Sequence, residues 1–218
     1  MIHFLNGNKS NKDMMMKSIF SDQYSALEYI YSDEVELVSI NRPNFSDVEE
    51  LSLKFIKSKQ PLKLRWVQDL DDKNSIKNVL SESIESSFRS VLMFQIDESI
   101  KILNSLMGCK KVRIRLETLR SPMCPLFHVD NIQFRLLMTL CGKGTEWIPN
   151  NLVDWEILSD INNHNNPVSA NSEIQEFQVG NLSLLKGGSW NNHFNGVVHR
   201  SPLSDEDRLL LSLDPIFE

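Results

Sequence analysis

Residues 124–141 read CPLFHVDNIQFRLLMTLC, and this stretch decides the fold that we predict. Residues 133–141 are a short, mostly apolar run, which is typical of a buried β-strand. Residues 126–130 form a second strand-like run that carries His128 and Asp130 two positions apart. Because alternate side chains of a strand point to the same face, these two side chains would point together into the interior of a barrel. The stretch therefore predicts two strands, one of which carries side chains that bind metals.

The rest of the C-terminal half, residues 110–218, continues this pattern. Helical periodicity disappears, and short strand-like runs alternate with glycine and proline turn signals. The further runs are residues 111–119, 174–179, 182–186, 195–200 and 208–213. So many short strands within about 100 residues are typical of a β-sandwich or a double-stranded jelly-roll barrel.

The N-terminal half, residues 1–109, is different and reads as mostly helical. Its helical segments are residues 22–31, the region that starts at Ser46, and residues 74–107. Ser46 and Glu49 have the form of a capping box, and Gly108 is a plausible helix stop. The expected strands in this half are residues 35–40 and 62–67.

Helices first and strands afterwards predict an α+β fold. We expect a single domain over residues 1–218, a length that one hydrophobic core can support. Residues 1–109 would be a mainly helical support, and residues 110–218 would be a jelly-roll core with the metal site. The predicted core is thus a double-stranded β-helix of the jelly-roll, cupin-like kind, with the helical half packed on it.

Composition argues against several classes of protein. The chain has 218 residues, with 23 Lys plus Arg against 29 Asp plus Glu and a net charge of −6, so it lacks the basic excess of a typical nucleic-acid binder. No apolar run approaches the roughly 18 residues that span a membrane, and the first residues have no signal-peptide core. We therefore expect a cytoplasmic protein without membrane or nucleic-acid partners, which acts on a small molecule or a protein. The three cysteines, an odd and low count, do not suggest a disulfide framework.

A second histidine completes a candidate metal site. His199 lies in the strand-like run 195–200, where it shares a face with Val197. Two histidines and one carboxylate are the facial triad that binds non-haem Fe(II) and leaves positions open for substrate and oxygen. We therefore predict that His128, Asp130 and His199 are the metal ligands and form the catalytic centre.

An arginine follows the second histidine. Arg208 lies nine residues after His199, at the start of the run 208–213, and would enter the same cavity. An isolated guanidinium in an apolar barrel is costly, and a carboxylate ligand held by two hydrogen bonds would offset that cost. The order of these motifs is the one that 2-oxoglutarate-dependent oxygenases use, in which the metal chelates the keto acid and the arginine binds its far carboxylate. Arg200 competes for this cofactor-binding role, and Arg135 is a third candidate.

The ordered segments CPLFHVDNIQFRLLMTLCGKGTEWIPN, GNLSLLKGGSW and GVVHRSP…DRLLLSLD resemble a bacterial family of unknown function. The resemblance covers roughly residues 110–215. It implies a soluble bacterial protein with no settled activity, often encoded near zinc-uptake and metal-chaperone genes, and a fold similar to the 2-oxoglutarate/Fe(II) oxygenase jelly roll. The oxygenase pattern falls on His128, Asp130, His199 and Arg208, and it implies the cofactors Fe(II) and 2-oxoglutarate.

Three functions fit these residues. The first is an enzyme, a 2-oxoglutarate/Fe(II)-dependent oxygenase of the hydroxylase type. The second is a non-redox zinc-binding protein of zinc homeostasis that uses the same ligands, to which Cys124 or Cys141 could be added because cysteine, histidine and aspartate suit zinc. The third is a jelly roll that only binds a small ligand.

Each site residue also has a purely structural interpretation. His128 and Asp130 could be a hydrogen-bonded polar pair on a sheet, and His199 could be a core histidine. Arg208 could instead form a surface ion pair with a nearby acid, Asp205 or Glu206.

Overall fold

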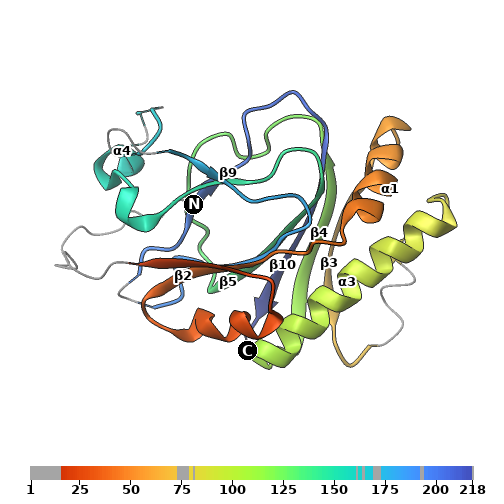
Figure 1. The fold of residues 1–218 in the computed structure, drawn as a ribbon, viewed down its shortest axis with the longest axis horizontal. Coiled ribbons are helices and arrows are strands. Elements are labelled where there is room, and N and C mark those ends of the chain that lie inside the picture. The colour runs from red at the N-terminus through yellow and green to blue at the C-terminus, as the bar shows by residue number, and fades with distance from the viewer. Residues whose placement is uncertain are drawn as a thin grey trace.

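A seven-stranded sheet, which we call the large sheet, runs through the computed structural model of the chain (Figure 1). The structure describes residues 16–72, 79–80, 82–160, 162–163, 165–168, 173–191 and 194–217. In spatial order the strands are β1 (Lys17–Ser21), β2 (Val35–Ile40), β8 (Leu182–Lys186), β5 (Phe134–Cys141), β10 (Arg208–Ile216), β4 (Lys111–Leu119) and β3 (Lys63–Asp69). Neighbouring strands are antiparallel, except that β1 and β2 are parallel.

A small sheet packs on one face of the large sheet. Its strands, in spatial order, are β7 (Gln175–Glu176), β6 (Glu146–Ile148) and β9 (Val198–Arg200). Leu137 and Leu210 of the large sheet share an apolar cluster with Trp147 of β6 and with Phe177, which follows β7. The rings of Trp147 and Phe177 are stacked, with centroids 5.5 Å apart. We call the face of the large sheet that carries Leu137 and Leu210 the inner face.

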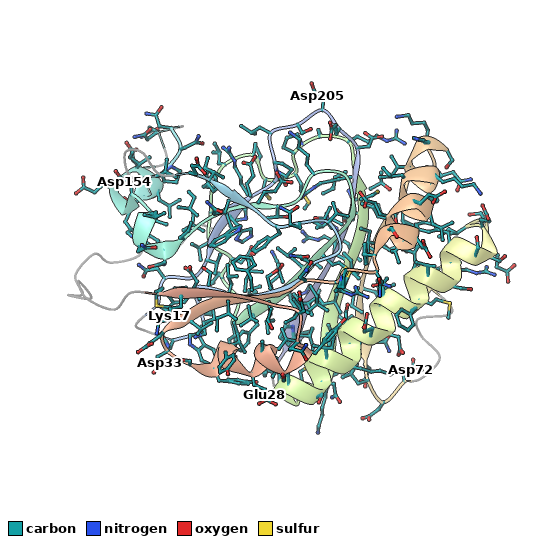
Figure 2. All side chains as sticks on the ribbon, in the orientation of Figure 1. Lys17, Glu28, Asp33, Asp72, Asp154 and Asp205 are labelled. Carbon is teal, nitrogen blue, oxygen red and sulfur yellow. The ribbon has the colours of Figure 1, made fainter. Side chains whose placement is uncertain are left out.

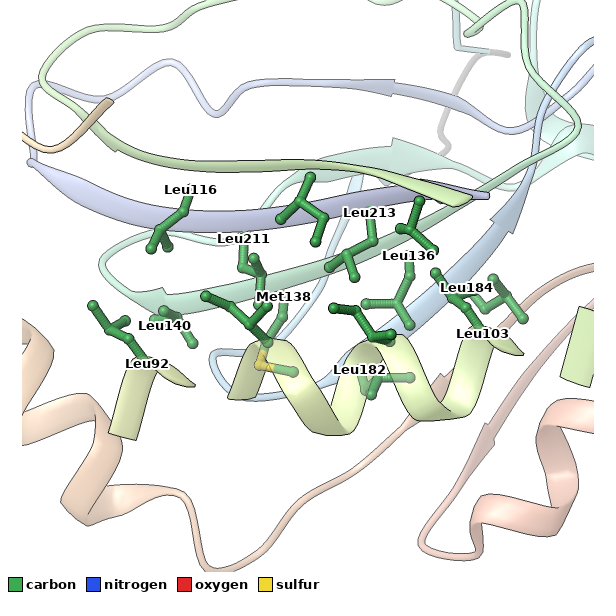
Figure 3. Packing of buried hydrophobic residues seen from close by; sticks show 14 of the residues in the cluster. Leu92, Leu103, Leu116, Leu136, Met138, Leu140, Leu182, Leu184, Leu211 and Leu213 are labelled. Atoms are coloured by element: carbon green, nitrogen blue, oxygen red, sulfur yellow. The ribbon is translucent and has the colours of Figure 1, made fainter. Parts of the chain in front are cut away.

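Helices cover the opposite, outer face of the large sheet (Figure 1). They are η1 (Tyr24–Tyr31), α1 (Ser46–Lys57) and α3 (Ser86–Met107), while the short η2 (Asn150–Leu152) and α4 (Trp155–Ser159) follow β6. Leu92, Ile96 and Leu103 form one buried stripe of α3, because residues four and seven positions apart share a helix face. Figure 3 shows this helix against leucines of the large sheet, among them Leu136 and Leu211.

The predicted strands of the C-terminal half largely agree with the structure. Residues 111–119 and 182–186 are confirmed as β4 and β8. The runs 133–141 and 208–213 are confirmed as β5 and as the longer β10. The runs 174–179 and 195–200 form shorter strands, β7 and β9, because only a few of their residues pair with β6. A mixed α+β fold with a strand-rich sheet is thus observed.

The N-terminal half contributes strands as well as helices. The predicted strands 35–40 and 62–67 are confirmed as β2 and β3. Residues 17–21 form a further strand, β1, that the sequence did not predict. β2 is buried along its whole length and lies between β1 and β8 in the large sheet. Residues from both halves of the chain therefore build one sheet.

The helix ends agree only in part. Gly108 ends α3 in the left-handed conformation, with φ of 63°, as predicted. The capping box is wrong, because α1 begins at Ser46 itself and the preceding Phe45 occupies the cap position. Phe45 is buried and contacts Gly180, so packing fixes this helix start. The predicted helix 22–31 is a 3₁₀ helix, η1.

The predicted helical region 74–107 extends beyond α3, and its residues 74–78 and 81 lie outside the described part of the chain.

Acidic side chains at the outer edge of the molecule, such as Glu28, Asp72 and Asp205, are seen in Figure 2. Within the described residues, no helix combines the length and the apolar character needed to cross a membrane.

Candidate metal centre

His128 and His199 are joined by a single pair of backbone hydrogen bonds. The N–H group of each residue donates to the carbonyl of the other, at 3.0 Å in both directions. The predicted strand 126–130 is otherwise wrong, because only His128 of this run pairs as in a sheet. The chain turns away after the bridge, and the carbonyl of Asp130 accepts a hydrogen bond from Gly188 instead of continuing a ladder.

The three predicted ligands converge all the same. The Nε2 atom of His199 lies 3.1 Å from Oδ2 of Asp130, and Nε2 of His128 lies 3.9 Å from Oδ1. The two imidazole ring centroids are 4.7 Å apart. One candidate ligand atom from each residue lies within 4.8 Å of the other two. This spacing allows one divalent cation to contact all three side chains.

The backbone fixes both imidazoles in the form that binds a metal. Nδ1 of His128 lies 3.0 Å from the carbonyl oxygen of Leu126, and Nδ1 of His199 lies 3.0 Å from that of Val197. A carbonyl only accepts, so each Nδ1 carries a hydrogen and each Nε2 is the nitrogen that can bind a metal once it carries no proton. The donor set therefore fits a metal ion, with two imidazole nitrogens and one carboxylate oxygen facing one point.

Burial and neighbouring charge tune the same side chains. Burial and the neighbouring His199 lower the pKa of His128, which favours the neutral ring. Burial by itself would raise the pKa of Asp130. The hydrogen bond from His199 and the charge of Arg135 outweigh that effect, so the pKa of Asp130 is well below its usual range. Both shifts favour the protonation states that a metal ligand needs.

Arg135 of β5 holds the aspartate ligand. Its Nε and Nη2 atoms donate to the two oxygens of Asp214, at 2.7 and 2.8 Å, and its Nη1 atom donates to Oδ2 of Asp130. The guanidinium thus binds two carboxylates, and one of them belongs to Asp130, a predicted metal ligand. Its predicted contact with a co-substrate stays a prediction.

Arg208 is a buried cation that forms no ion pair with an acid among the residues that the structure describes. Its residue is 4% exposed at the start of β10, and its three hydrogen bonds go to neutral oxygens of Lys143, Thr145 and Ser201, at 3.3 to 3.4 Å. Burial lowers the pKa of Arg208 to about 10, against smaller opposing effects of Glu176 and other anions. No ion pair of Arg208 with Asp205 or Glu206 occurs in the structure, which describes both acids. A carboxylate bound to this guanidinium would offset the cost of burying its charge.

Arg200 is engaged elsewhere, in the small sheet. Its Nε atom donates to Glu146 at 2.6 Å, and its Nη1 atom donates to Asn166 at 2.9 Å. The guanidinium also lies over the ring of Phe127, 4.2 Å from the centroid. Of the two arginines that compete for the anion-binding role, Arg208 is therefore the one without a carboxylate partner.

The cysteines do not join the candidate metal centre. The described group of potential metal ligands contains His128, Asp130 and His199, and no cysteine. Cys141 is fully buried, and burial raises the pKa of its thiol to about 12. The carbonyl of Cys124 accepts a hydrogen bond from the N–H group of Ser201, two residues after His199, and its side chain is not part of the described ligand group.

Sequence reasoning missed Asp214, Thr145 and Ser201, which support the predicted residues. Asp214 could have been found from the sequence. It is an acid in the otherwise apolar strand β10, and it lies six positions after Arg208, so the two side chains must point to the same face of the sheet. The contacts of Thr145 and Ser201 with Arg208 could not have been found from the sequence, because the two residues reach Arg208 from different segments of the chain.

The fold of the chain is similar to the folds of two solved dioxygenases. The fold is similar to that of a dioxygenase for auxin oxidation from Arabidopsis thaliana, solved as a binary complex with 2-oxoglutarate. The TM-score is 0.54 and the identity 11%, over 94% of this chain and 93% of that one. It is also similar to a dioxygenase for auxin oxidation from rice, with a TM-score of 0.51 and 10% identity over 92% and 83% of the two chains. The chain thus has a dioxygenase-like fold.

The chain belongs to the DUF1826 family of proteins of unknown function, whose model matches residues 21–214. Comparison with curated proteins finds no match.

Proposed function

We propose that this protein is a 2-oxoglutarate/Fe(II)-dependent oxygenase of the hydroxylase type. His128, Asp130 and His199 would hold the metal, and Arg208 would bind the far carboxylate of 2-oxoglutarate. The two sheets would correspond to the double-stranded β-helix of such enzymes. The observation that carries the proposal is the combination of a converging His-Asp-His group with a buried arginine that forms no ion pair with any acid that the structure describes.

The donor set favours this metal chemistry. Two imidazoles and one carboxylate leave coordination positions open, which is typical of non-haem Fe(II) oxygenases. When bound, the metal would bring together molecular oxygen, which is the oxidant, and the keto acid, whose oxidative decarboxylation to succinate supplies two electrons, so that one oxygen atom could be inserted into a substrate C–H bond and the other into succinate. The chain itself would orient the imidazoles through their Nδ1–H groups and restrain Asp130 through Arg135.

The position of Arg208 fits a short dicarboxylate. Ser201, which accepts a hydrogen bond from Arg208, lies two residues after His199. Two residues of extended backbone span about 7 Å, which is comparable to the length of a five-carbon keto acid. A molecule that reaches the metal with one end could therefore meet Arg208 with the other, where it would offset the cost of the buried charge.

A zinc-binding protein of zinc homeostasis is the second candidate. Two imidazoles and one carboxylate also suit Zn²⁺, and the same three residues would hold it. This alternative explains the ligands but gives no use for the buried Arg208. We also propose a cytoplasmic location, and a small molecule or a protein as the substrate.

Metal and keto-acid binding distinguish these candidates. Adding Fe(II) and 2-oxoglutarate to the metal-free protein without oxygen should produce a weak visible charge-transfer band. His128→Ala should abolish the band, and Arg208→Ala should weaken keto-acid binding while the metal still binds. Arg200→Ala is the matched control and should leave the keto-acid affinity unchanged.

Two other results would contradict the oxygenase proposal. Stoichiometric zinc binding without any response to 2-oxoglutarate would favour the zinc-binding protein. Absence of stoichiometric metal binding of any kind would leave a jelly roll that binds a small ligand.

A further inference from the structure

Two arginines of β4 lie on the inner face of the large sheet, two strands from β5, which carries Arg135. Arg113 is directly opposite Asp214 of β10, and Arg115 is directly opposite Ser212. Opposite residues of antiparallel strands point to the same face, with Cβ atoms about 5 Å apart. Asp214 in turn holds Arg135, which binds the aspartate ligand. Asp214 and Arg135 therefore lie between Arg113 and the candidate metal centre.

The cations continue on the edge strand β3. Arg65 lies opposite Arg115, and Lys63 lies opposite Glu117. Arg65 forms an ion pair with Glu117, and both Arg65 and Arg115 donate to the sulfur of Met123 at 3.8 Å. Met123 belongs to the segment that leads from β4 to His128. We call Lys63, Arg65, Arg113 and Arg115 the cationic strip.

Stability does not account for the two arginines of β4. Neither Arg113 nor Arg115 forms an ion pair with a carboxylate in the part of the chain that the structure describes. Like charges that lie directly opposite one another, such as Arg65 and Arg115, destabilise a sheet. Charges on an edge strand protect it from pairing with another sheet, but β4 lies between β10 and β3 and has no free edge.

The cationic strip contrasts with the rest of the molecule. The whole chain has a net charge of −6, and acidic side chains such as Asp72 and Asp205 lie at its outer edge (Figure 2). Arg113 is exposed and Arg115 is half-buried, so both can meet a ligand from solvent. A local positive field beside a site concentrates anions there, and the planar guanidinium fork matches carboxylate and phosphate oxygens.

We propose that the substrate of this site is a small molecule with a phosphate or carboxylate group, and that Arg113 and Arg115 bind this group. The proposal rests on the proposed function, which identifies the neighbouring triad as the reacting centre. The two arginines occupy adjacent rows of one sheet face within an acidic chain. This arrangement fits a single anionic group and lacks the long basic surface that a nucleic-acid polymer needs.

Binding of three matched probes to the metal-free chain of 218 residues tests the proposal. The probes are glycerol 3-phosphate, glycerate and glycerol, and their affinities are measured by calorimetry or by NMR titration. At least one of the two anions should bind and glycerol should not, and the tighter anion identifies the preferred group. Arg113→Gln and Arg115→Gln should each weaken the binding about tenfold, because each removes a charge-assisted hydrogen bond.

Control variants separate this site from its neighbours. Arg89→Gln removes the same charge from α3, on the outer side of the large sheet, and should leave probe affinity unchanged. Arg113→Lys keeps the charge and loses the fork, so its affinity should be intermediate. Thermal unfolding of each variant checks that it is folded.

Any of five outcomes would overturn the proposal. Two concern the probes: neither anion binds, or glycerol binds equally well. Two more are unchanged binding in the Arg113→Gln, Arg115→Gln double variant and tighter binding of a single-stranded oligonucleotide than of the probes. Loss of binding in Arg208→Gln but not in Arg113→Gln would also overturn it, since the probe would then occupy the co-substrate position. His128→Ala should still bind the probe. If the unmodified protein binds the probe but gives no charge-transfer band with Fe(II) and 2-oxoglutarate, the proposed function alone is contradicted.

Discussion

Asp130 is held from two sides before any metal binds. His199 faces one of its oxygens, and Arg135 donates to the same carboxylate from β5. Arg135 cannot swing away easily, because its other edge is bound by both oxygens of Asp214. A ligand that is already oriented by such outer contacts binds a metal more tightly, since less side-chain freedom is lost. At the scale of residues, the site is therefore a row of three ion-paired side chains, Asp214, Arg135 and Asp130, and Asp130 faces the metal position.

Replacing Asp214 by asparagine tests this chain. Asp214→Asn removes the charge that fixes Arg135, so Asp130 should be less well oriented. We expect metal affinity to fall by about 10–100-fold, as measured by anaerobic titration with Fe(II) or Co(II). Asp205→Asn makes the same change in an exposed loop and should have no effect. Equal metal affinity in the two variants would show that Asp214 does not position the ligand.

Lys186 gives the molecule a pH-dependent stability. Its Nζ atom donates to the carbonyl of Ser32 at 2.7 Å, and burial lowers the pKa of Lys186 to about 8, against a small opposing effect of Asp33. Between about pH 8 and the ordinary lysine value, the folded state has released the proton while the unfolded state still binds it. The free energy of unfolding should therefore rise with pH in this window.

Urea unfolding at several pH values measures the effect of Lys186. Between pH 7.5 and 9.5, wild type should gain about 1–2 kcal/mol relative to the Lys186→Met variant, which cannot release a proton there. Parallel stability curves for the two proteins would contradict the prediction.

At the scale of elements, α3 is the main cover of the large sheet. Leu92, Ile96 and Leu103 are almost completely buried, whereas Phe94 on another side of the same helix is 60% exposed. The helix therefore contributes to stability through one stripe, which Figure 3 shows against the sheet leucines.

Truncation of this stripe should be costly. Leu103→Ala should lower the free energy of unfolding by about 2–5 kcal/mol, because it removes buried area and leaves a cavity. Phe94→Ala, the matched control on the exposed side, should change it by about 0.5 kcal/mol or less. Chemical denaturation of both variants measures the difference, and similar losses in the two would mean that α3 does not pack as described.

At the scale of the whole molecule, the two halves of the sequence share the large sheet. β2 of the N-terminal half pairs with β8, and β3 pairs with β4. The outer face of β5 and β10 is covered by helices of the N-terminal half. The prediction of a single domain over residues 1–218 is consistent with this arrangement and stays a prediction.

A fragment of residues 110–218 tests it. Without residues 1–109 the fragment would expose the apolar outer face of its strands and unpaired edges on β4 and β8, so it should not fold by itself. Circular dichroism and NMR dispersion of the purified fragment measure this. A cooperative unfolding transition with native-like spectra would instead indicate two independent domains.

Much of the site was predictable because strand alternation and ligand chemistry are local properties. A metal site could be predicted without any structure from the spacing of His128 and Asp130 and from the residue types at His199 and Arg208. The strand predicted around His128 was nevertheless wrong, because only His128 pairs with a neighbouring segment and the chain then turns away. The ligands converge through this bridge and not through strand alternation.

The sequence by itself determined which residue types were available: two imidazoles, one carboxylate, an arginine in an apolar run, and the alternating patterns that make strands. Only the tertiary structure decided which arginine has which partner, because Arg135, Arg200 and Arg208 look alike in the sequence. The carboxylates that pair with Arg135 and Arg200 lie 79 and 54 positions away in the sequence. Electrostatic energy depends on distance in space, and only the folded chain sets those distances.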